Sequence, residues 1–231
     1  MRKLGILKDG YSLDFEDWMK DVCSFLVNTL SNVSYAYTQS DEITLLFSPT
    51  TFNEKSQTFE PHVYNGRRDK LLTLCASLAT QRFHRHMVLQ GGLDLMDSLP
   101  HAVFDARLGV YASLADAFEL VLWRSYDCSV NAVSTTLHLD PVTVTADGTP
   151  LSRKEVGTMN TVQKLVLLYE AGRMAGMTHH QRYGTLLHRQ RQPCEVTNRL
   201  TGDTEIKDKY CVEQVEGLIV NSVKEGKIVL S

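Results

Sequence analysis

The sequence predicts an α+β fold: an antiparallel sheet in a split β-α-β arrangement, with helices on one face. Two observations predict it. Segments whose apolar side chains recur at helical spacing alternate with short runs that have the apolar-polar alternation of half-buried strands. Over the first ~110 residues the order is strand, helix, strand, strand, helix, strand, which is the order of a split β-α-β motif.

In chain order, these elements are predicted over residues 4–7, 14–30, 33–37, 43–47, 67–86 and 102–104. The first strand is a short apolar run that meets a turn at Asp9-Gly10, and the first helix carries one apolar stripe. Only five polar residues separate the strands over 33–37 and 43–47, so we expect a hairpin with Asp41 and Glu42 at or near its tip. A loop that contains Gln90-Gly91-Gly92 follows the second helix.

The second part of the chain is predicted to be helical and then β-rich. Ser113 and Asp116 form the Ser-x-x-acid pattern that caps a helix start, and apolar spacing carries that helix to about residue 135. A further helix is expected over 161–175, and residues 198–203 are typical of a turn between two short strands. We expect a principal domain over residues 1–136 and a C-terminal extension over 137–231 that packs on it and does not fold independently.

The composition is that of a folded domain: 43% of the 231 residues are hydrophobic and 22% are charged, which excludes a disordered chain. The formal net charge is −3, so any contact with nucleic acid requires a local basic patch. No apolar run reaches the ~18 residues of a membrane helix, and we expect no membrane partner. The five cysteines are scattered and form no C-x-x-C motif, so a reduced, cytoplasmic protein is expected.

Two carboxylates form the first candidate site. In a split β-α-β sheet the end of the first strand approaches the hairpin tip, so Asp9 is expected near Asp41. Two such carboxylates repel each other unless a cation lies between them, and Mg²⁺ binds through one or two carboxylates plus substrate phosphates. Gly10 lets the backbone approach a metal or a phosphate closely. A pair of ions there would activate a 3′-hydroxyl and stabilise a pyrophosphate leaving group. The alternative for Asp41 and Glu42 is a solvated turn.

Three cations open the second predicted helix: Arg67, Arg68 and Lys70. Helix N-termini carry unpaired amides and the positive end of the helix dipole, so this cluster is a candidate triphosphate site. The alternative is a solvated charged turn.

Polar residues also share one face of the third predicted helix, where Arg124, Asp127 and Asn131 follow each other at helical spacing. Such residues are costly to bury unless they pair, either with each other or with a ligand. His179 and His180 lie in a polar context without zinc-ligand spacing, and we expect both on the surface.

Three motifs resemble the tRNA(His) guanylyltransferase family, which includes relatives that extend RNA in the 3′-to-5′ direction. The motifs are Tyr37-Thr38-Gln39-Ser40-Asp41-Glu42-Ile43-Thr44, Phe104-Asp105-Ala106-Arg107 and Trp123-Arg124-x-x-Asp127-Cys128-x-x-Asn131. Their order and spacing are also similar to the family's, and the resemblance covers about residues 9–190.

The resemblance implies a palm similar to that of polymerases and nucleotide cyclases, which binds two Mg²⁺ ions. It implies that a tRNA 5′-phosphate is activated with ATP or GTP and then attacked by the 3′-hydroxyl of GTP. Asp41 looks like the family's metal-binding acid, with Ser40 and Glu42 beside it. Asp9, Asp41 and Glu42 are therefore the expected catalytic residues, and Ser40 is expected to contact the nucleotide. The implied partners are nucleoside triphosphates and tRNA, in particular tRNA(His), and the implied assembly is a tetramer.

The resemblance also suggests roles outside the hairpin. The cluster of Arg67, Arg68 and Lys70 looks like the family's triphosphate-binding segment, and Asn131 matches its functional asparagine. The segment Arg182-Tyr183-Gly184-Thr185 resembles the family's late Arg-x-Gly-Thr segment.

The N-terminus departs from the family pattern. The family's Asp-Gly normally precedes a long loop, whereas Asp9-Gly10 is followed almost at once by the first predicted helix. Either a loop is deleted and Asp9, with the Gly10 carbonyl, is the first metal ligand, or Asp9 matches by coincidence. The sequence thus leaves two possibilities open. One is a Mg²⁺-dependent nucleotidyltransferase, and the other is a catalytically impaired relative that binds nucleotide or tRNA. A nucleotide cyclase is the third possibility, against which the Trp123-Arg124 motif argues.

Overall fold

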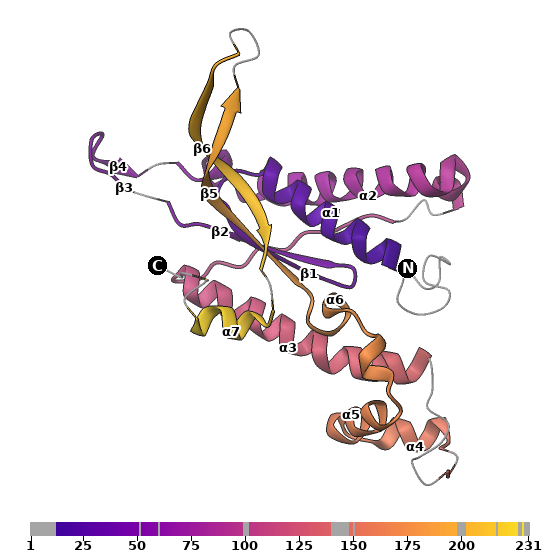
Figure 1. Cartoon of the computed structure of the whole chain (residues 1–231). Helices are drawn as coiled ribbons and strands as arrows, with labels where there is room; N and C mark the ends of the chain where they lie inside the picture. The colour runs from indigo at the N-terminus through magenta and orange to yellow at the C-terminus, as the bar shows by residue number, and fades with distance from the viewer. Residues whose placement is uncertain are drawn as a thin grey trace.

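The computed structural model describes residues 13–50, 52–59, 61–98, 102–139, 148–149, 151–197, 202–215, 217–225 and 228. It is an α+β structure in which a four-stranded antiparallel sheet has helices on both faces (Figure 1). The predicted strand over 4–7, together with Asp9 and Gly10, lies outside the described residues. Among the described residues, no helix combines the length and the apolarity that a bilayer crossing needs.

The first described helix and the hairpin after it match the predictions. α1 (Leu13–Thr29) buries one apolar stripe against the sheet. β1 (Val33–Gln39) and β2 (Glu42–Phe47) then pair antiparallel. Gln39 lies opposite Glu42, so the connecting turn consists of Ser40 and Asp41 alone.

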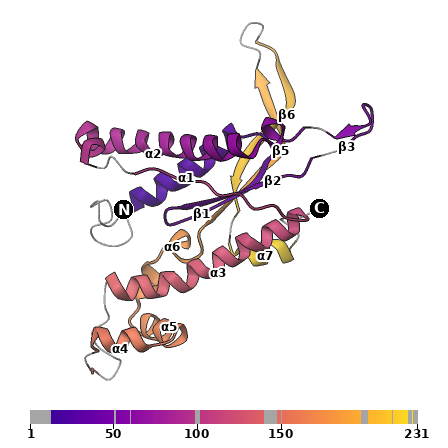
Figure 2. The ribbon, with the colours of Figure 1, turned by 180° about the vertical axis from the view of Figure 1, so that it is seen from behind.

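The strands occur in the order β2-β1-β5-β6, so two segments far apart in the sequence share one sheet. β5 (Thr185–Thr197) pairs with β1 only through its first four residues, from Thr185 to His188. The rest of β5 pairs with β6 (Thr204–Gln214), and this two-stranded ribbon extends beyond the body of the molecule (Figures 1 and 2). The strands on either side of the turn predicted over 198–203 are therefore long rather than short.

The strand predicted over 102–104 is wrong, because residues 102–111 have no strand partner among the described residues. The backbone groups of this extended segment bond instead to side chains of α2 (Arg68–Ser98). The amide of Phe104 donates to Thr80 Oγ1 at 2.9 Å, and the carbonyl of Ala102 lies 2.7 Å from His84 Nε2. Backbone groups satisfied by side chains need no neighbouring strand.

α2 begins where predicted, just after a short 3-10 turn, η2 (Val63–Gly66), but it continues well past residue 86. The expected loop at Gly91-Gly92 lies inside the helix. A glycine inside a helix costs about 1 kcal/mol, which is enough to weaken the helix but not to end it.

α3 (Leu114–Leu139) begins at the predicted cap, where the amide of Asp116 donates to Ser113 Oγ at 3.1 Å. The helix predicted over 161–175 is shorter than expected: α5 (Thr161–Glu170) ends before Gly172, whose φ is 67°. The remaining described elements are short: β3 (Phe52–Asn53), β4 (Thr58–Phe59), α4 (Arg153–Thr158), η3 (Arg173–Gly176), α6 (His179–Tyr183) and α7 (Ile219–Lys224).

The sheet has a separate hydrophobic core on each face. Successive residues of β1 point to opposite faces, so Ala36 packs with α1 and α2 while Tyr37 packs in the cluster that includes Phe118 and Val121 of α3. α1 and α2 thus share one face and α3 covers the other (Figure 1). The prediction of helices on one face alone is wrong, because β1 has buried apolar side chains on both of its faces. The domain boundary at residue 136 stays a prediction; α3 runs across that residue, and β5 joins the same sheet as β1.

Candidate functional site

The tip of the β1–β2 hairpin presents one carboxylate to solvent. Ser40 and Asp41 form the whole turn, and both side chains are exposed. Ser40 has φ = 47°, in the left-handed region that non-glycine residues rarely occupy. Within the described part of the chain, Asp41 has no hydrogen bond or ion pair, so its oxygens are free for a ligand. The predicted partners Asp9 and Gly10 are outside that part.

The residues on either side of this turn are both held by Arg124 of α3. The Arg124 guanidinium forms an ion pair with Glu42 through Nη2. The side chain of Gln39 accepts from the same Nη2 at 3.0 Å and donates to the Arg124 backbone carbonyl at 3.2 Å. Glu42 is therefore engaged with a cation of the protein, whereas Asp41 is not.

The polar face predicted on the third helix is internally paired. Arg124 Nη1 lies 3.7 Å from Asp127 Oδ2, and Asn131 Nδ2 donates to the same oxygen at 3.1 Å. Of the two alternatives for this face, mutual pairing is the one that the structure contains. Asn131 is exposed, so its second amide hydrogen and its oxygen still face solvent.

A set of tight contacts beneath the tip fixes β1 against the start of β5. The hydroxyl groups of Tyr37 and Ser125 both donate to the carbonyl of Tyr183, at 2.8 and 2.9 Å. Gly184 has φ = 75°, and a Cβ atom added there would lie 2.2 Å from the Tyr37 hydroxyl. Only glycine fits this position, which accounts for the glycine of the Arg182-Tyr183-Gly184-Thr185 segment.

A polar contact of the buried Glu16 joins α1 to Thr178, the residue that caps the start of α6. Glu16, which is 7% exposed, pairs with Lys20 at 2.5 Å and accepts from Thr178 Oγ1 at 2.9 Å. His180 is buried as well, with Nδ1 2.8 Å from Thr185 Oγ1, so the expected surface position is wrong for this histidine. Burial lowers the pKa of His180 to about 4, against the opposing effect of Glu16, so the ring is neutral at pH 7.

The basic cluster lies at the other end of the hairpin. Phe47, at the end of β2, packs against His62 with ring centroids 5.7 Å apart, shortly before Arg67 and Arg68. Because β1 spans six residue steps from Val33 to Gln39, the cluster and the tip are separated by roughly 20 Å. Figures 1 and 2 agree, since α2 begins far from the hairpin tip in both views.

The three cations of the cluster are exposed and have only local contacts. Arg68 pairs with its neighbour Asp69 at 3.4 Å, and Lys70 lies over the Tyr64 ring at 4.8 Å. The structure therefore does not bring Arg67, Arg68 and Lys70 together with Asp41.

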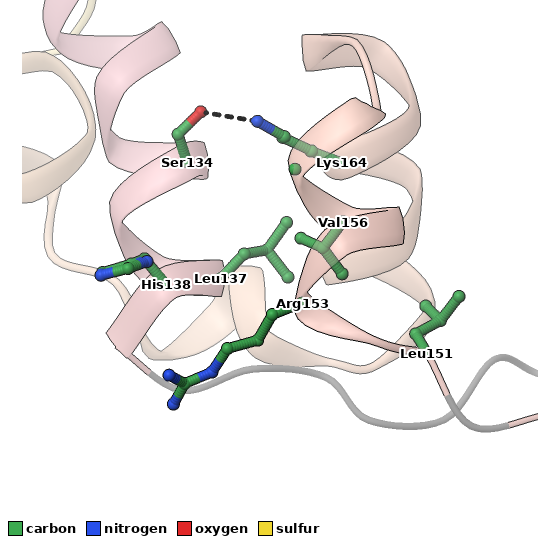
Figure 3. A pocket seen from close by; sticks show the side chains of 8 residues that line it. Ser134, Leu137, His138, Leu151, Arg153, Val156 and Lys164 are labelled. Atoms are coloured by element: carbon green, nitrogen blue, oxygen red, sulfur yellow. Dashed lines mark hydrogen bonds between the residues drawn. The ribbon is translucent and has the colours of Figure 1, made fainter.

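A separate pocket of about 120 Å³ lies between α3 and the α4–α5 pair (Figure 3). Leu137 and Val156 point into it, and Lys164 Nζ donates to Ser134 Oγ at 3.4 Å on its border. None of the predicted site residues lines this pocket.

Among the described site residues that the sequence predicted, Asp41 is the carboxylate without a partner in the protein. No group of three or more His, Cys, Asp or Glu side chains converges anywhere in the described part of the chain. A single free carboxylate fits a Mg²⁺ ion that takes its other ligands from water and substrate phosphates. Asp9, the predicted second carboxylate, lies outside the described residues.

Sequence reasoning missed Gln39 and Glu42 as contacts of Arg124. It also missed the Tyr183 carbonyl as the acceptor of the Tyr37 hydroxyl. Arg124 and Tyr37 both belong to the family-like motifs, but their partners lie on other elements. Gln39 is 85 residues from Arg124, and Tyr183 is 146 residues from Tyr37. The signal in the sequence was a polar face on an otherwise apolar helix, whose arginine requires an acceptor.

The model of the family described as tRNAHis guanylyltransferase matches residues 7–112. This match confirms the resemblance for the motifs that contain Asp41 and Asp105, and the motif that begins at Trp123 lies outside the matched residues. A relative from Acanthamoeba polyphaga mimivirus, an uncharacterized protein, is 37% identical over 119 residues, which are 44% of this chain and 39% of that protein. The match thus spans well under half of that relative's length.

Solved structures share the fold over most of the chain. A bacterial tRNA(His) guanylyltransferase-like protein in complex with ATP has a TM-score of 0.64 at 18% identity and covers 93% of this chain and 78% of that one. The complex of such a protein with GTP has a TM-score of 0.60 at 18% identity and covers 93% of this chain and 77% of that one. The Saccharomyces cerevisiae tRNA(His) guanylyltransferase has a TM-score of 0.58 at 17% identity, and the match covers 81% of this chain and 79% of that one. The predicted α+β fold is therefore confirmed.

Proposed function

We propose that this chain is a Mg²⁺-dependent nucleotidyltransferase that adds a guanylate to the 5′ end of tRNA in the 3′-to-5′ direction. The observation that carries the proposal is Asp41, a free carboxylate on a two-residue turn whose flanking residues are both fixed by Arg124. The family match over residues 7–112 and the fold shared with ATP- and GTP-bound relatives support this reaction class.

In this proposal Asp41 holds Mg²⁺ together with Asp9 and the carbonyl of Gly10. A bound Mg²⁺ supplies charge that neutralises the triphosphate and favours ionisation of the attacking hydroxyl. Mg²⁺ prefers hard oxygen ligands, which the exposed oxygens of Asp41 provide.

The chain itself positions the reactants. The 3′-hydroxyl oxygen of GTP forms a bond to the activated 5′ phosphorus of the tRNA, and the activating nucleotide or pyrophosphate leaves. We assign Asp41 to hold the metal ion that would bind the phosphate groups, and Ser40 to contact those groups through its exposed hydroxyl. Asn131 has a free amide oxygen and hydrogen for a nucleotide or a phosphate.

The basic cluster is assigned to phosphates that lie away from the reacting ones. A triphosphate at Asp41 does not reach Arg67, Arg68 and Lys70, because roughly 20 Å of β1 separates the two places. Exposed cations at a helix N-terminus suit phosphate groups of the tRNA or of a second triphosphate.

The test is nucleotide addition in vitro. The purified chain is incubated with Mg²⁺, ATP, labelled GTP and two tRNA(His) transcripts with 5′-monophosphates, one intact and one lacking its first nucleotide. We expect label at the 5′ end of at least one transcript, and the pair distinguishes addition to a complete end from repair of a truncated one. The proposal is wrong if the wild-type protein labels neither transcript.

The second candidate is a catalytically impaired relative that binds nucleotide or tRNA. It is favoured by the engagement of Glu42 with Arg124, which leaves Asp41 as the one free carboxylate at the described tip. Such a protein would bind GTP with little dependence on Mg²⁺ or Mn²⁺, whereas an active enzyme binds the metal more tightly with GTP present.

The assembly and the location also belong to the proposal. We expect a tetramer, as the family resemblance implies, and sedimentation analysis should give four times the chain mass of 26.0 kDa. A reduced, cytoplasmic setting fits five cysteines that are all free thiols.

A further inference from the structure

We propose that Arg124 is the positioning residue of the hairpin tip: it holds both residues that flank the Ser40-Asp41 turn and thereby sets the direction of the Asp41 carboxylate. This role deepens the proposed function and rests on it, because the reaction is what the direction of Asp41 serves.

The turn needs an external support. It has only two residues, and Ser40 is held at φ = 47° without the freedom of glycine. β2 is an edge strand of the described sheet, so only β1 pairs with it there. Thr38 Oγ1 donates to the Glu42 carbonyl at 3.0 Å, a bond that fixes the backbone of the turn but leaves its side chains free to pivot.

Arg124 provides that support from a rigid element. It lies in the middle of α3, six residues after Phe118 and three residues after Val121, and both of these side chains are fully buried. Its guanidinium is planar, and Nη2 carries two N–H donors in fixed directions, so this one nitrogen can hold two acceptors in a defined geometry. Here those acceptors are Glu42 and Gln39.

The environment strengthens the contact. The Arg124 side chain is 20% exposed and the Glu42 side chain is 56% exposed, so the ion pair is shielded from solvent and salt only on the side of the guanidinium. Gln39 is buried and also donates back to the Arg124 carbonyl, so it binds both the side chain and the backbone of the arginine. Asp127 approaches the other guanidinium nitrogen and keeps the arginine directed at the hairpin.

The two acids of the tip therefore have different tasks. Glu42 is bound to α3 through the guanidinium, whereas Asp41 has no described partner and faces solvent. The pair combines one carboxylate that fixes the turn with one that remains free to bind a ligand.

The experiment compares Arg124→Ala, Arg124→Lys and Glu42→Gln with the wild type and with Arg85→Ala, an exposed arginine on α2. Two quantities are measured: kcat and KM for guanylate addition to tRNA, and amide hydrogen exchange at residues 40–42. Arg124→Ala should lower kcat by about 10²-fold with little change in KM, the effect expected when a reacting group is displaced by about 1 Å. Exchange at the turn should become faster.

Arg124→Lys should recover part of the lost kcat, because an ammonium still pairs with Glu42 but lacks the fork that also reaches Gln39. Glu42→Gln should be intermediate, and Arg85→Ala should match the wild type. If Arg124→Ala fails to fold, the test uses Arg124→Lys and Glu42→Gln instead, and their melting temperatures show whether these variants are folded.

The outcomes separate the two proposals. An active wild type whose kcat is unchanged in Arg124→Ala and Arg124→Lys overturns the positioning role and leaves the proposed function intact. An inactive wild type overturns the proposed function, and hydrogen exchange then decides whether Arg124 fixes the turn. Unchanged exchange at residues 40–42 in the arginine variants would refute that role as well.

Discussion

The two ends of the β1–β2 hairpin both carry charged residues, but the protein holds them in different ways. At the tip, Gln39 and Glu42 are bound by Arg124, and Asp41 between them stays free. At the other end, Arg67, Arg68 and Lys70 are exposed and touch only near neighbours.

This difference indicates what each end can do. A reacting group has to be held within a fraction of an ångström, which requires packed and hydrogen-bonded support. Attraction of phosphates by exposed cations acts over several ångströms and tolerates mobile side chains. The tip is therefore suited to chemistry and the basic end to electrostatic binding, a contrast that the following experiments test.

The largest effect is expected at Asp41. Asp41→Asn keeps the shape of the side chain but removes the charge, and guanylate addition should fall by at least about 10²-fold. The matched control is Asp69→Asn, an exposed acid beside Arg68 at the basic end, which should leave kcat within about twofold of the wild type. Equal losses in both variants would remove the contrast between the ends.

The support beneath the tip should be sensitive to one methyl group. Gly184→Ala places a Cβ against the Tyr37 hydroxyl at a positive φ, so the free energy of unfolding should fall by about 3 kcal/mol. Gly176→Ala is the control, because a Cβ there meets no atom within 4 Å. Urea denaturation measures both, and a Gly184→Ala protein as stable as the wild type would show that this packing is not needed.

His180 should make stability depend on pH. Its pKa is about 4 in the folded chain and 6.5 in the reference state, so the unfolded chain binds more protons between these values. Stability should therefore be complete above pH 6.5 and fall as the pH decreases, by about 2 kcal/mol between pH 7 and pH 5.

His180→Asn should flatten that pH dependence. Burial lowers the pKa of His188 as well, so a smaller slope should remain in the variant. The measurement is urea denaturation of both proteins at pH 5 and pH 7. Identical slopes would mean that His180 is protonated in the fold or exposed in solution.

The smallest effects are expected at the basic end. Arg67→Ala, Arg68→Ala and Lys70→Ala should each raise the KM for tRNA a few-fold and leave kcat unchanged. Each should also reduce the salt dependence of binding by about one unit of slope for every phosphate that the variant no longer binds. A tenfold loss of kcat in any of them would place the cluster in contact with the reacting phosphates and contradict the separation of the two ends.

Local patterns predicted the local structure. The apolar stripe of α1, the hairpin around the polar break and the Ser113 cap each depend on residues close in sequence, and these three predictions are confirmed. The half-buried alternation predicted for β1 is wrong, because both faces of that strand are covered. The motif around Asp41 likewise indicated the family whose model matches residues 7–112.

Long-range partners could not be predicted in the same way. The extended segment at Phe104 bonds to a side chain of α2 instead of a strand, and β5 joins β1 from the far end of the chain. The Arg124–Glu42 ion pair joins elements 82 residues apart, and no periodicity reports such a contact. These features depend on which surfaces meet after folding, and the local spacing of residues does not contain that information.

The most direct test of the metal assignment is Mn²⁺ binding followed by electron paramagnetic resonance, with and without GTP, in the wild type and in Asp41→Asn. If Asp41 is a metal ligand beside bound triphosphate, GTP should tighten Mn²⁺ binding to the wild type well beyond its binding to GTP alone. The Asn variant should lose about 10-fold or more in affinity. Equal Mn²⁺ affinity in the two proteins, with GTP present, would contradict the assignment of Asp41 to the metal.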